Sequence, residues 1–201
     1  VTLNKQKSLN AVTDEMLTRL NHQLDIWEAA DHIDRILIRA AEGRAFSAGG
    51  DIRHLYDCGI SGDFDFDFFA REYVLNARIA GLTKPYIALI NGIAMGGGVG
   101  VSFHGSHRIG GPALQFAMPE VGIGFFPDVG GSYILSRLPG KLGLYLGLTG
   151  SRVAQSDALW SGLITQASDL ADENELLDDL AKGLDLNAVL SNRAAQLQPG
   201  P

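Results

Sequence analysis

Two carboxylates in this sequence have closely matching surroundings. Each follows a proline within an apolar, glycine-containing segment, Met118-Pro119-Glu120 and Phe126-Pro127-Asp128. A proline fixes the backbone before each acid, and an apolar setting disfavours the charged form of a carboxyl group. Carboxyl groups with raised pKa values are candidates for proton transfer. The simpler alternatives are a helix N-cap for Asp128 and a loop carboxylate at a strand end for Glu120.

A run of three glycines, Gly96 to Gly98, precedes these acids by about twenty residues. It follows an apolar, β-rich segment from Tyr86 to Ile90 and a turn at Asn91-Gly92, so the pattern predicts a strand, a tight turn and the start of a helix. Glycine has no Cβ and lets a ligand approach the backbone, where unpaired N–H groups at a helix start favour negative charge. The glycine run is therefore a candidate oxyanion site.

The elements around these residues predict an α/β fold. An opening strand at Val1 to Leu3 is followed by an amphipathic helix that Asn10 or Thr13 can cap and that ends near Ala30, and then by a strand from Ile33 to Arg39. Strand, helix and strand in this order predict a parallel βαβ unit. Further helices are expected over residues 64–82, 129–138, 141–148, 156–162 (capped by Ser156) and 173–184, with a short strand over 163–166.

Two other segments allow more than one interpretation. Ala45 to Arg53 is rich in small residues and would lie at the carboxyl end of a strand, where α/β folds bind ligands, but its spacing alone favours a plain turn. Glu72 lies on the expected helix over residues 64–82, where an isolated carboxylate is most simply a solvated charge. The aromatic residues of that segment are expected to serve packing rather than to form a stacking platform; they are Phe64, Phe66, Phe68, Phe69 and Tyr73.

Composition narrows the functional classes. The chain has 201 residues, 46% of them hydrophobic, which suits one domain with a full core, and a formal net charge of -7 without a basic block argues against a nucleic-acid-binding surface. A single cysteine, Cys58, excludes an internal disulfide. No membrane-spanning run and no signal-peptide pattern are present, so we expect a soluble protein that binds no membrane.

Several common motifs are absent. The glycine run lacks the third glycine of a dinucleotide-binding fingerprint, Gly140-Lys141 lacks the rest of a phosphate-binding loop, and no serine stands in a G-x-S-x-G pattern. His104 and His107 have no third ligand nearby, so we interpret them as ordinary surface or capping histidines and expect no metal.

Three ordered motifs resemble those of a known family. The segments AFSAGGDI, KPYIALINGIAMGGGVG and FAMPEVGIGFFPDVGGSYILSRL together are similar to the crotonase (enoyl-CoA hydratase/isomerase) superfamily, and most similar to its 3-hydroxyisobutyryl-CoA hydrolase branch. The similarity extends from about Thr2 to Gln166. It implies a crotonase-like fold of repeated ββα units with surrounding helices, in one domain over residues 1–201 that lacks the family's first strand and its C-terminal helices.

The resemblance also implies a ligand and roles for individual residues. In the family two backbone N–H groups bind the thioester oxygen of an acyl-CoA, and by position these belong to Gly50 and Gly97. Ala48 would lie by the nucleotide part of CoA. CoA is then part of the substrate, and no separate cofactor is expected.

The carboxylates distinguish the branches of the superfamily. Hydratases have two glutamates, and the first falls at Gly100 here, so hydration is disfavoured. The hydrolase branch has glycine at that position, acids matching Glu120 and Asp128, and a substrate-contacting glutamate matching Glu72. We therefore expect hydrolysis of an acyl-CoA thioester, 3-hydroxyisobutyryl-CoA in valine degradation, with Glu120 as nucleophile or general base and Asp128 as its partner.

Two alternatives to this function stay open at the level of the sequence. One is an enoyl-CoA isomerase or hydratase that uses Glu120 alone, and the other is a CoA-binding paralogue without turnover. The family's C-terminal helices cover the site and make subunit contacts, which allows a homo-oligomer, but residues 187–201 are short and unlike them. The expected location is cytoplasmic for a bacterial protein and mitochondrial for a eukaryotic one.

Overall fold

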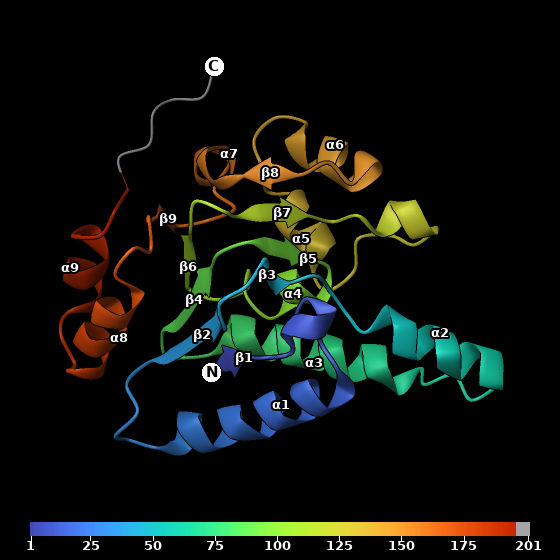
Figure 1. The fold of residues 1–201 in the computed structure, drawn as a ribbon, viewed down its shortest axis with the longest axis horizontal. Coiled ribbons are helices and arrows are strands. Elements are labelled where there is room, and N and C mark those ends of the chain that lie inside the picture. The colour runs from blue at the N-terminus through green and yellow to red at the C-terminus, as the bar shows by residue number, and fades with distance from the viewer. Residues whose placement is uncertain (196–201) are drawn as a thin grey trace.

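Parallel β-strands form the centre of the molecule (Figure 1), which we describe from a computed structural model over residues 1–195. One sheet has five parallel strands in the order β1-β2-β4-β6-β9, and a second has four in the order β3-β5-β7-β8, with β8 antiparallel to β7. The first sheet contains β1 (Thr2–Leu3), β2 (Ile36–Ala40), β4 (Tyr86–Ile90), β6 (His107–Gly110) and β9 (Gln166–Ala167). The second contains β3 (Ala45–Ser47), β5 (Ile93–Met95), β7 (Gln115–Ala117) and β8 (Val153–Ala154).

The core forms where β4 lies between its neighbours β2 and β6. All five residues of β4 are buried, as expected of a strand that is covered on both faces and therefore reads as a continuous apolar run. The sharp turn between β4 and β5 places Gly92 at φ +87°, in the left-handed region that favours glycine. A short β5 therefore follows β4 after only two residues and enters the second sheet.

Two long helices lie side by side against the first sheet (Figure 1). α1 (Asp14–Ala29) begins at Thr13, whose hydroxyl accepts a hydrogen bond from the Met16 amide at 3.3 Å. Its buried face consists of Leu17, Leu20 and Leu24. α3 (Asp67–Gly81) packs against it and carries buried residues on the face opposite solvent, which positions part of the functional site.

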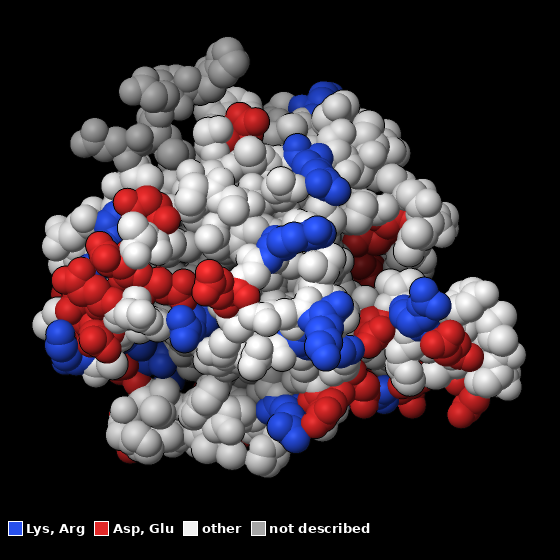
Figure 2. Space-filling view, in the orientation of Figure 1, with Lys and Arg blue, Asp and Glu red and all other residues white. Residues whose placement is uncertain are grey.

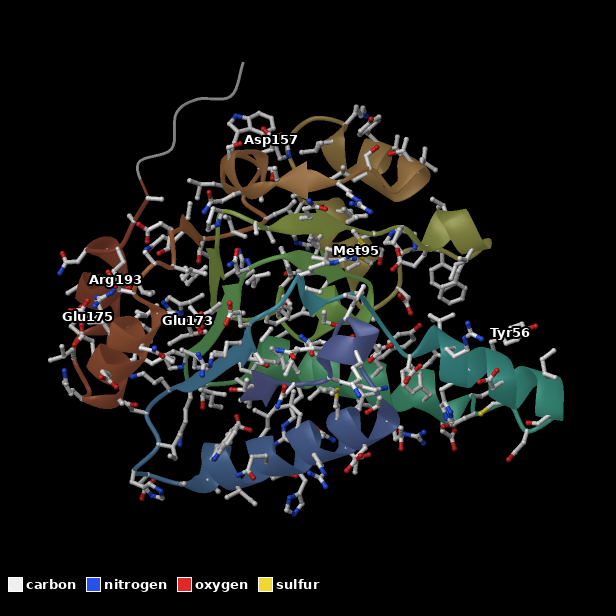
Figure 3. All side chains as sticks on the ribbon, in the orientation of Figure 1. Tyr56, Met95, Asp157, Glu173, Glu175 and Arg193 are labelled. Carbon is white, nitrogen blue, oxygen red and sulfur yellow. The ribbon has the colours of Figure 1, made fainter. Side chains whose placement is uncertain are left out.

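The remaining elements are short. They are η1 (Gln6–Ser8), α2 (Ile52–Ser61), α4 (Gly97–Gly100), η2 (Glu120–Ile123), α5 (Gly131–Leu135), α6 (Leu142–Thr149), α7 (Gln155–Trp160), α8 (Glu173–Ala181) and α9 (Leu186–Ser191). α2 extends outward from the body of the molecule, with Tyr56 on it, and α8 and α9 lie together at the opposite end (Figures 1 and 3). There Arg193 forms ion pairs with Asp179 at 2.7 Å and Glu175 at 3.7 Å.

The fold confirms the parallel βαβ unit at the start of the chain. β1 precedes α1 in the sequence, β2 follows it, and the two strands pair in parallel. Several sequence-based expectations were wrong in detail. Ser156 does not cap α7, which begins at Gln155 after Ala154 without a side-chain cap, and the helix expected over 129–138 is shorter, at Gly131–Leu135. The aromatic residues of the segment 64–82 do pack against one another, in the pairs Phe64–Phe66, Phe68–Phe69 and Phe69–Tyr73, although only Phe68 of the five is buried and Phe66 is 76% exposed.

The surface carries both signs of charge without a continuous basic face on the side seen in Figure 2. Acidic residues gather over α8, and lysines and arginines lie scattered between other residues. None of the described helices is both long and apolar enough to cross a membrane. Within residues 1–195 no cluster of three His, Cys, Asp or Glu side chains is arranged to hold a metal ion.

Candidate active site

The ends of three neighbouring strands converge on one place. β5 pairs in parallel with β3 on one side and with β7 on the other, so the carboxyl ends of all three strands lie at the same edge of the second sheet. Met95, near the centre of the molecule in Figure 3, ends β5 and leads into the glycine run. The segments that follow these strands begin with Ala48, Gly96 and Met118, so each candidate segment from the sequence reaches this edge.

The first two segments bring two backbone amides together. A Cβ placed on Gly97 would lie 3.0 Å from the Gly50 nitrogen, so the two residues are in close contact. Gly49, at φ +121°, turns the chain so that Gly50 faces the start of α4. Neither the Gly50 nor the Gly97 amide has a hydrogen-bond acceptor among the described residues. Both donors are therefore available to a ligand.

Glu72 projects from α3 toward the same glycines. Its side chain is only 2% exposed, and its Oε1 has no hydrogen-bond partner in the described part of the chain. The absence of a side chain on Gly97 makes room for this oxygen, because a Cβ there would overlap it. Burial, followed by the nearby charges of Asp128 and Glu120, raises the Glu72 pKa to about 8. The interpretation of Glu72 as a solvated charge was therefore wrong.

Glu120 begins η2, three residues after the end of β7. Its Oε1 lies 3.0 Å from the point where a Cβ of Gly96 would stand, and its Oε2 has no partner among residues 1–195. Burial raises the pKa of Glu120 to about 7, with a smaller contribution from the charge of Asp128. A carboxyl group in this state can hold or release a proton near neutral pH.

Asp128 reaches the site from the loop before α5. Its Oδ2 accepts a hydrogen bond of 2.7 Å from the Tyr73 hydroxyl, and burial raises the Asp128 pKa although this hydrogen bond opposes the shift. It does not cap α5, whose N-cap is Gly130 and receives no side-chain hydrogen bond. The alternative of a simple helix cap for Asp128 is therefore not supported.

The site thus combines two free amides with three carboxyl groups whose pKa values are all raised. Ala48 lies next to it, half-buried, with its amide bonded to the Leu9 carbonyl at 3.0 Å. Sequence reasoning missed Tyr73 and Asn76. Asn76 is 4% exposed, and both polar atoms of its side chain lack a partner in the described region. Its position one helical turn after Glu72 was a signal that could have found it.

The raised pKa of Glu72 predicts a pH-dependent stability. Its pKa is about 8 in the folded protein against an ordinary 4.5, so between these values the folded chain retains a proton that the unfolded chain has released. Stability therefore falls as the pH rises from about 4.5 to 8. Glu72→Gln removes this titration and should gain about 1–3 kcal/mol relative to the wild type at pH 8, and much less at pH 5.

Urea unfolding of both proteins at pH 5 and pH 8 measures this difference. Asp63→Asn, which changes an exposed carboxylate in the loop before α3, serves as the matched control for the loss of one negative charge. A Glu72→Gln protein that is less stable than the wild type at pH 8 would contradict the raised pKa.

Comparison with known proteins places the chain in a family. Residues 1–200 match the family model described as enoyl-CoA hydratase/isomerase, and the chain therefore belongs to that family. The matched range includes β3, β5 and β7 with the glycine run and the acids that follow them. The crotonase-type α/β fold expected from the sequence is confirmed by this match and by solved structures of the same fold.

Several curated relatives have the name "3-hydroxyisobutyryl-CoA hydrolase, mitochondrial". The protein of Xenopus tropicalis is 51% identical over 82% of this chain and 43% of its own length. That of Danio rerio is 46% identical over 98% of this chain and 51% of its own length. The chain spans about half the length of the curated relatives it matches.

Solved structures with the same fold have other names. An enoyl-CoA hydratase from Rhodobacter sphaeroides 2.4.1 superposes with a TM-score of 0.91 at 40% identity, over 99% of this chain and 58% of that one. A carnitinyl-CoA dehydratase from Mycobacterium thermoresistibile gives a TM-score of 0.92, also at 40% identity, over 100% of this chain and 59% of that one. The fold is therefore shared by proteins named for different reactions of CoA esters.

Proposed function

We propose that this chain forms the catalytic part of an acyl-CoA thioester hydrolase. The observation that carries the proposal is the meeting of the free Gly50 and Gly97 amides with Glu120, a carboxyl group of pKa about 7. The amides provide the donors that an oxyanion requires, and the carboxyl group provides a base or nucleophile. The curated relatives at 45–51% identity are named as hydrolases of one such thioester, which supports the same function.

The proposed reaction replaces the carbon–sulfur bond of the thioester by a carbon–oxygen bond. Glu120, as the carboxylate, either takes a proton from a water that attacks the carbonyl carbon, or attacks that carbon itself and forms an anhydride that a water then hydrolyses. The carbonyl oxygen becomes an oxyanion held by the Gly50 and Gly97 amides. When this intermediate collapses, the carbon–sulfur bond breaks, and the thiolate of CoA leaves and takes the proton that the water gives up. Asp128, held by Tyr73, orients Glu120 or the water and manages that proton.

Hydration of a double bond is less well supported, because it needs a second acid near the glycine run. By resemblance the first hydratase glutamate falls at Gly100. A Cβ at Gly100 would lie 2.7 Å from Asn76 Nδ2 and 3.0 Å from the Val129 Cβ, so the space is already filled. A glutamate could enter only if the buried Asn76 side chain moved. Because of this crowding, the site does not suit a pair of glutamates, although a solved structure of the same fold is named an enoyl-CoA hydratase.

The substrate that we propose is 3-hydroxyisobutyryl-CoA, the compound in the name of the curated relatives, which fits valine degradation. Glu72, buried beside Gly97, would contact the acyl part, and Ala48 would lie by the nucleotide part of CoA. CoA belongs to the substrate, so the proposed reaction uses no separate cofactor. The proposal includes neither a nucleic-acid nor a membrane partner; it leaves room for a homo-oligomer, and for a mitochondrial location if the source is eukaryotic.

An enoyl-CoA isomerase is the second candidate, because the family description names isomerases and one carboxylate can shuttle a proton. Asp128→Asn separates the two functions. In a hydrolase it should lower the rate of thiol release by about 10²-fold, since a group that manages a proton is lost. In an isomerase that uses Glu120 alone, the rate of double-bond migration should hardly change.

Thiol release and double-bond migration are measured side by side on the wild type and on Asp128→Asn, with Asp63→Asn as the control. Unchanged thiol release in Asp128→Asn would remove Asp128 from the proposed mechanism. A third candidate, a CoA-binding paralogue without turnover, predicts tight acyl-CoA binding and no product from either reaction.

A further inference from the structure

The backbone just after Asp128 is strained. Val129 has φ +43°, in the left-handed region, which a β-branched residue rarely adopts. Gly130 follows at φ +77°, and the Gly131 amide donates a hydrogen bond to the Asp128 carbonyl at 2.5 Å. Asp128, at the start of this tight reversal, accepts the hydrogen bond from Tyr73. A strained conformation persists only where its surroundings fix it, so something must hold Val129.

His104 provides such a contact. Its Nε2 lies 2.7 Å from the Val129 carbonyl oxygen, and because a carbonyl can only accept, Nε2 carries the hydrogen. Burial lowers the pKa of His104, which favours the neutral ring. Gly130 faces the His104 ring, and a Cβ on Gly130 would overlap that ring. His104 is thus a specific partner of this reversal, whereas the sequence predicted an ordinary surface or capping histidine.

The element that carries His104 also carries a candidate oxyanion donor. α4 starts at Gly97, and helical bonding continues beyond it, with the Phe103 amide donating to the Val99 carbonyl at 2.8 Å. His104 follows directly. One short segment therefore presents the Gly97 amide at its start and the bond to the Asp128 loop at its end.

We infer that His104 is a positioning residue for Asp128, which it holds in place through the Val129 carbonyl. The inference deepens the proposed function and rests on it for the role of Asp128. Without the Nε2 donor, the loop can relax from its left-handed conformation and the Asp128 carboxylate leaves the Tyr73 hydroxyl. A residue that only fills space would lower stability when removed but would leave the geometry of Asp128 unchanged.

Three variants of His104 test this role in the intact protein. His104→Leu removes the donor, His104→Asn keeps a polar amide that stops short of the Val129 carbonyl, and His104→Gln places an amide N–H close to the Nε2 position. We expect both removal variants to lower kcat for thiol release by about 10²-fold with little change in KM, and His104→Gln to restore most of it. Both His104→Leu and His104→Asn are made, so that the test still works if one of these two variants does not fold.

A second readout does not depend on activity. The ¹³C NMR signal of labelled Tyr73, assigned by its loss in Tyr73→Phe, reports the hydrogen bond to Asp128. It should move in the removal variants and return in His104→Gln. An unchanged Tyr73 signal and unchanged kcat in a folded removal variant would overturn the inference. If the wild type releases no thiol, the proposed function fails, and the NMR comparison still decides whether His104 holds Asp128.

Discussion

Glu120→Gln is expected to lower the rate of thiol release from an acyl-CoA by about 10³-fold, because the amide can neither attack the carbonyl carbon nor accept a proton from water. The change keeps the shape of the side chain, which is only 8% exposed and begins η2. Acyl-CoA should therefore bind almost as tightly as before. Thiol release under single-turnover conditions, together with a direct binding titration, measures both quantities.

The pH dependence provides an internal check on this variant. With a pKa of about 7, Glu120 is the carboxylate above that pH and the neutral acid below it. A base or nucleophile must be deprotonated, so kcat/KM of the wild type should fall as the pH drops through about 7. The residual activity of Glu120→Gln should lack that inflection. Full activity in this variant would exclude Glu120 from the chemistry.

Gly97→Ala should be nearly as damaging, with a loss of about 10²–10³-fold in kcat, the usual effect of losing one oxyanion donor. The new methyl group would overlap Glu72 Oε1 and lie 3.0 Å from the Gly50 nitrogen. Neither neighbour can yield easily, because Glu72 is buried and Gly50 belongs to the backbone. The Gly97 amide would therefore move away from the position in which it can bind an oxyanion together with Gly50.

Gly81→Ala is the matched control, since nothing lies within 4 Å of its added Cβ at the end of α3. It should leave kcat unchanged and raise the melting temperature slightly, because alanine restricts the unfolded chain. Both variants are compared by thiol release and thermal unfolding. A Gly97→Ala protein with wild-type kcat would show that this amide does not bind the oxyanion.

Much of the central architecture could be predicted from local patterns. Five consecutive apolar residues predicted β4, and a turn signal at Asn91-Gly92 predicted the reversal that follows. α2 was not predicted from the sequence, because most of the apolar side chains of this helix face solvent and not the core. Tyr56 is 62% and Ile60 is 73% exposed. The caps of α2, Asp51 and Gly62, were the better signals.

The candidate site could be predicted only in part. The resemblance identified the acids and glycines, but the hydrogen bond between Tyr73 and Asp128 joins residues 55 apart in sequence and depends on how α3 lies beside the loop before α5. Burial of Glu72 did leave a signal, because Phe68, Glu72 and Ile79 follow helical spacing on one face of α3. A carboxylate on this mainly apolar face, which also carries Asn76, is the pattern that should have replaced the interpretation as a solvated charge.

Thiol release from 3-hydroxyisobutyryl-CoA by the intact protein, with hydration of crotonyl-CoA measured alongside, tests the central claim most directly. Our account predicts rapid release of CoA, followed with a thiol-reactive dye, and little hydration, because Gly100 and Asn76 leave no place for a second glutamate. Hydration or double-bond migration without release of thiol would contradict the proposed hydrolase and would favour one of the other reactions of its family.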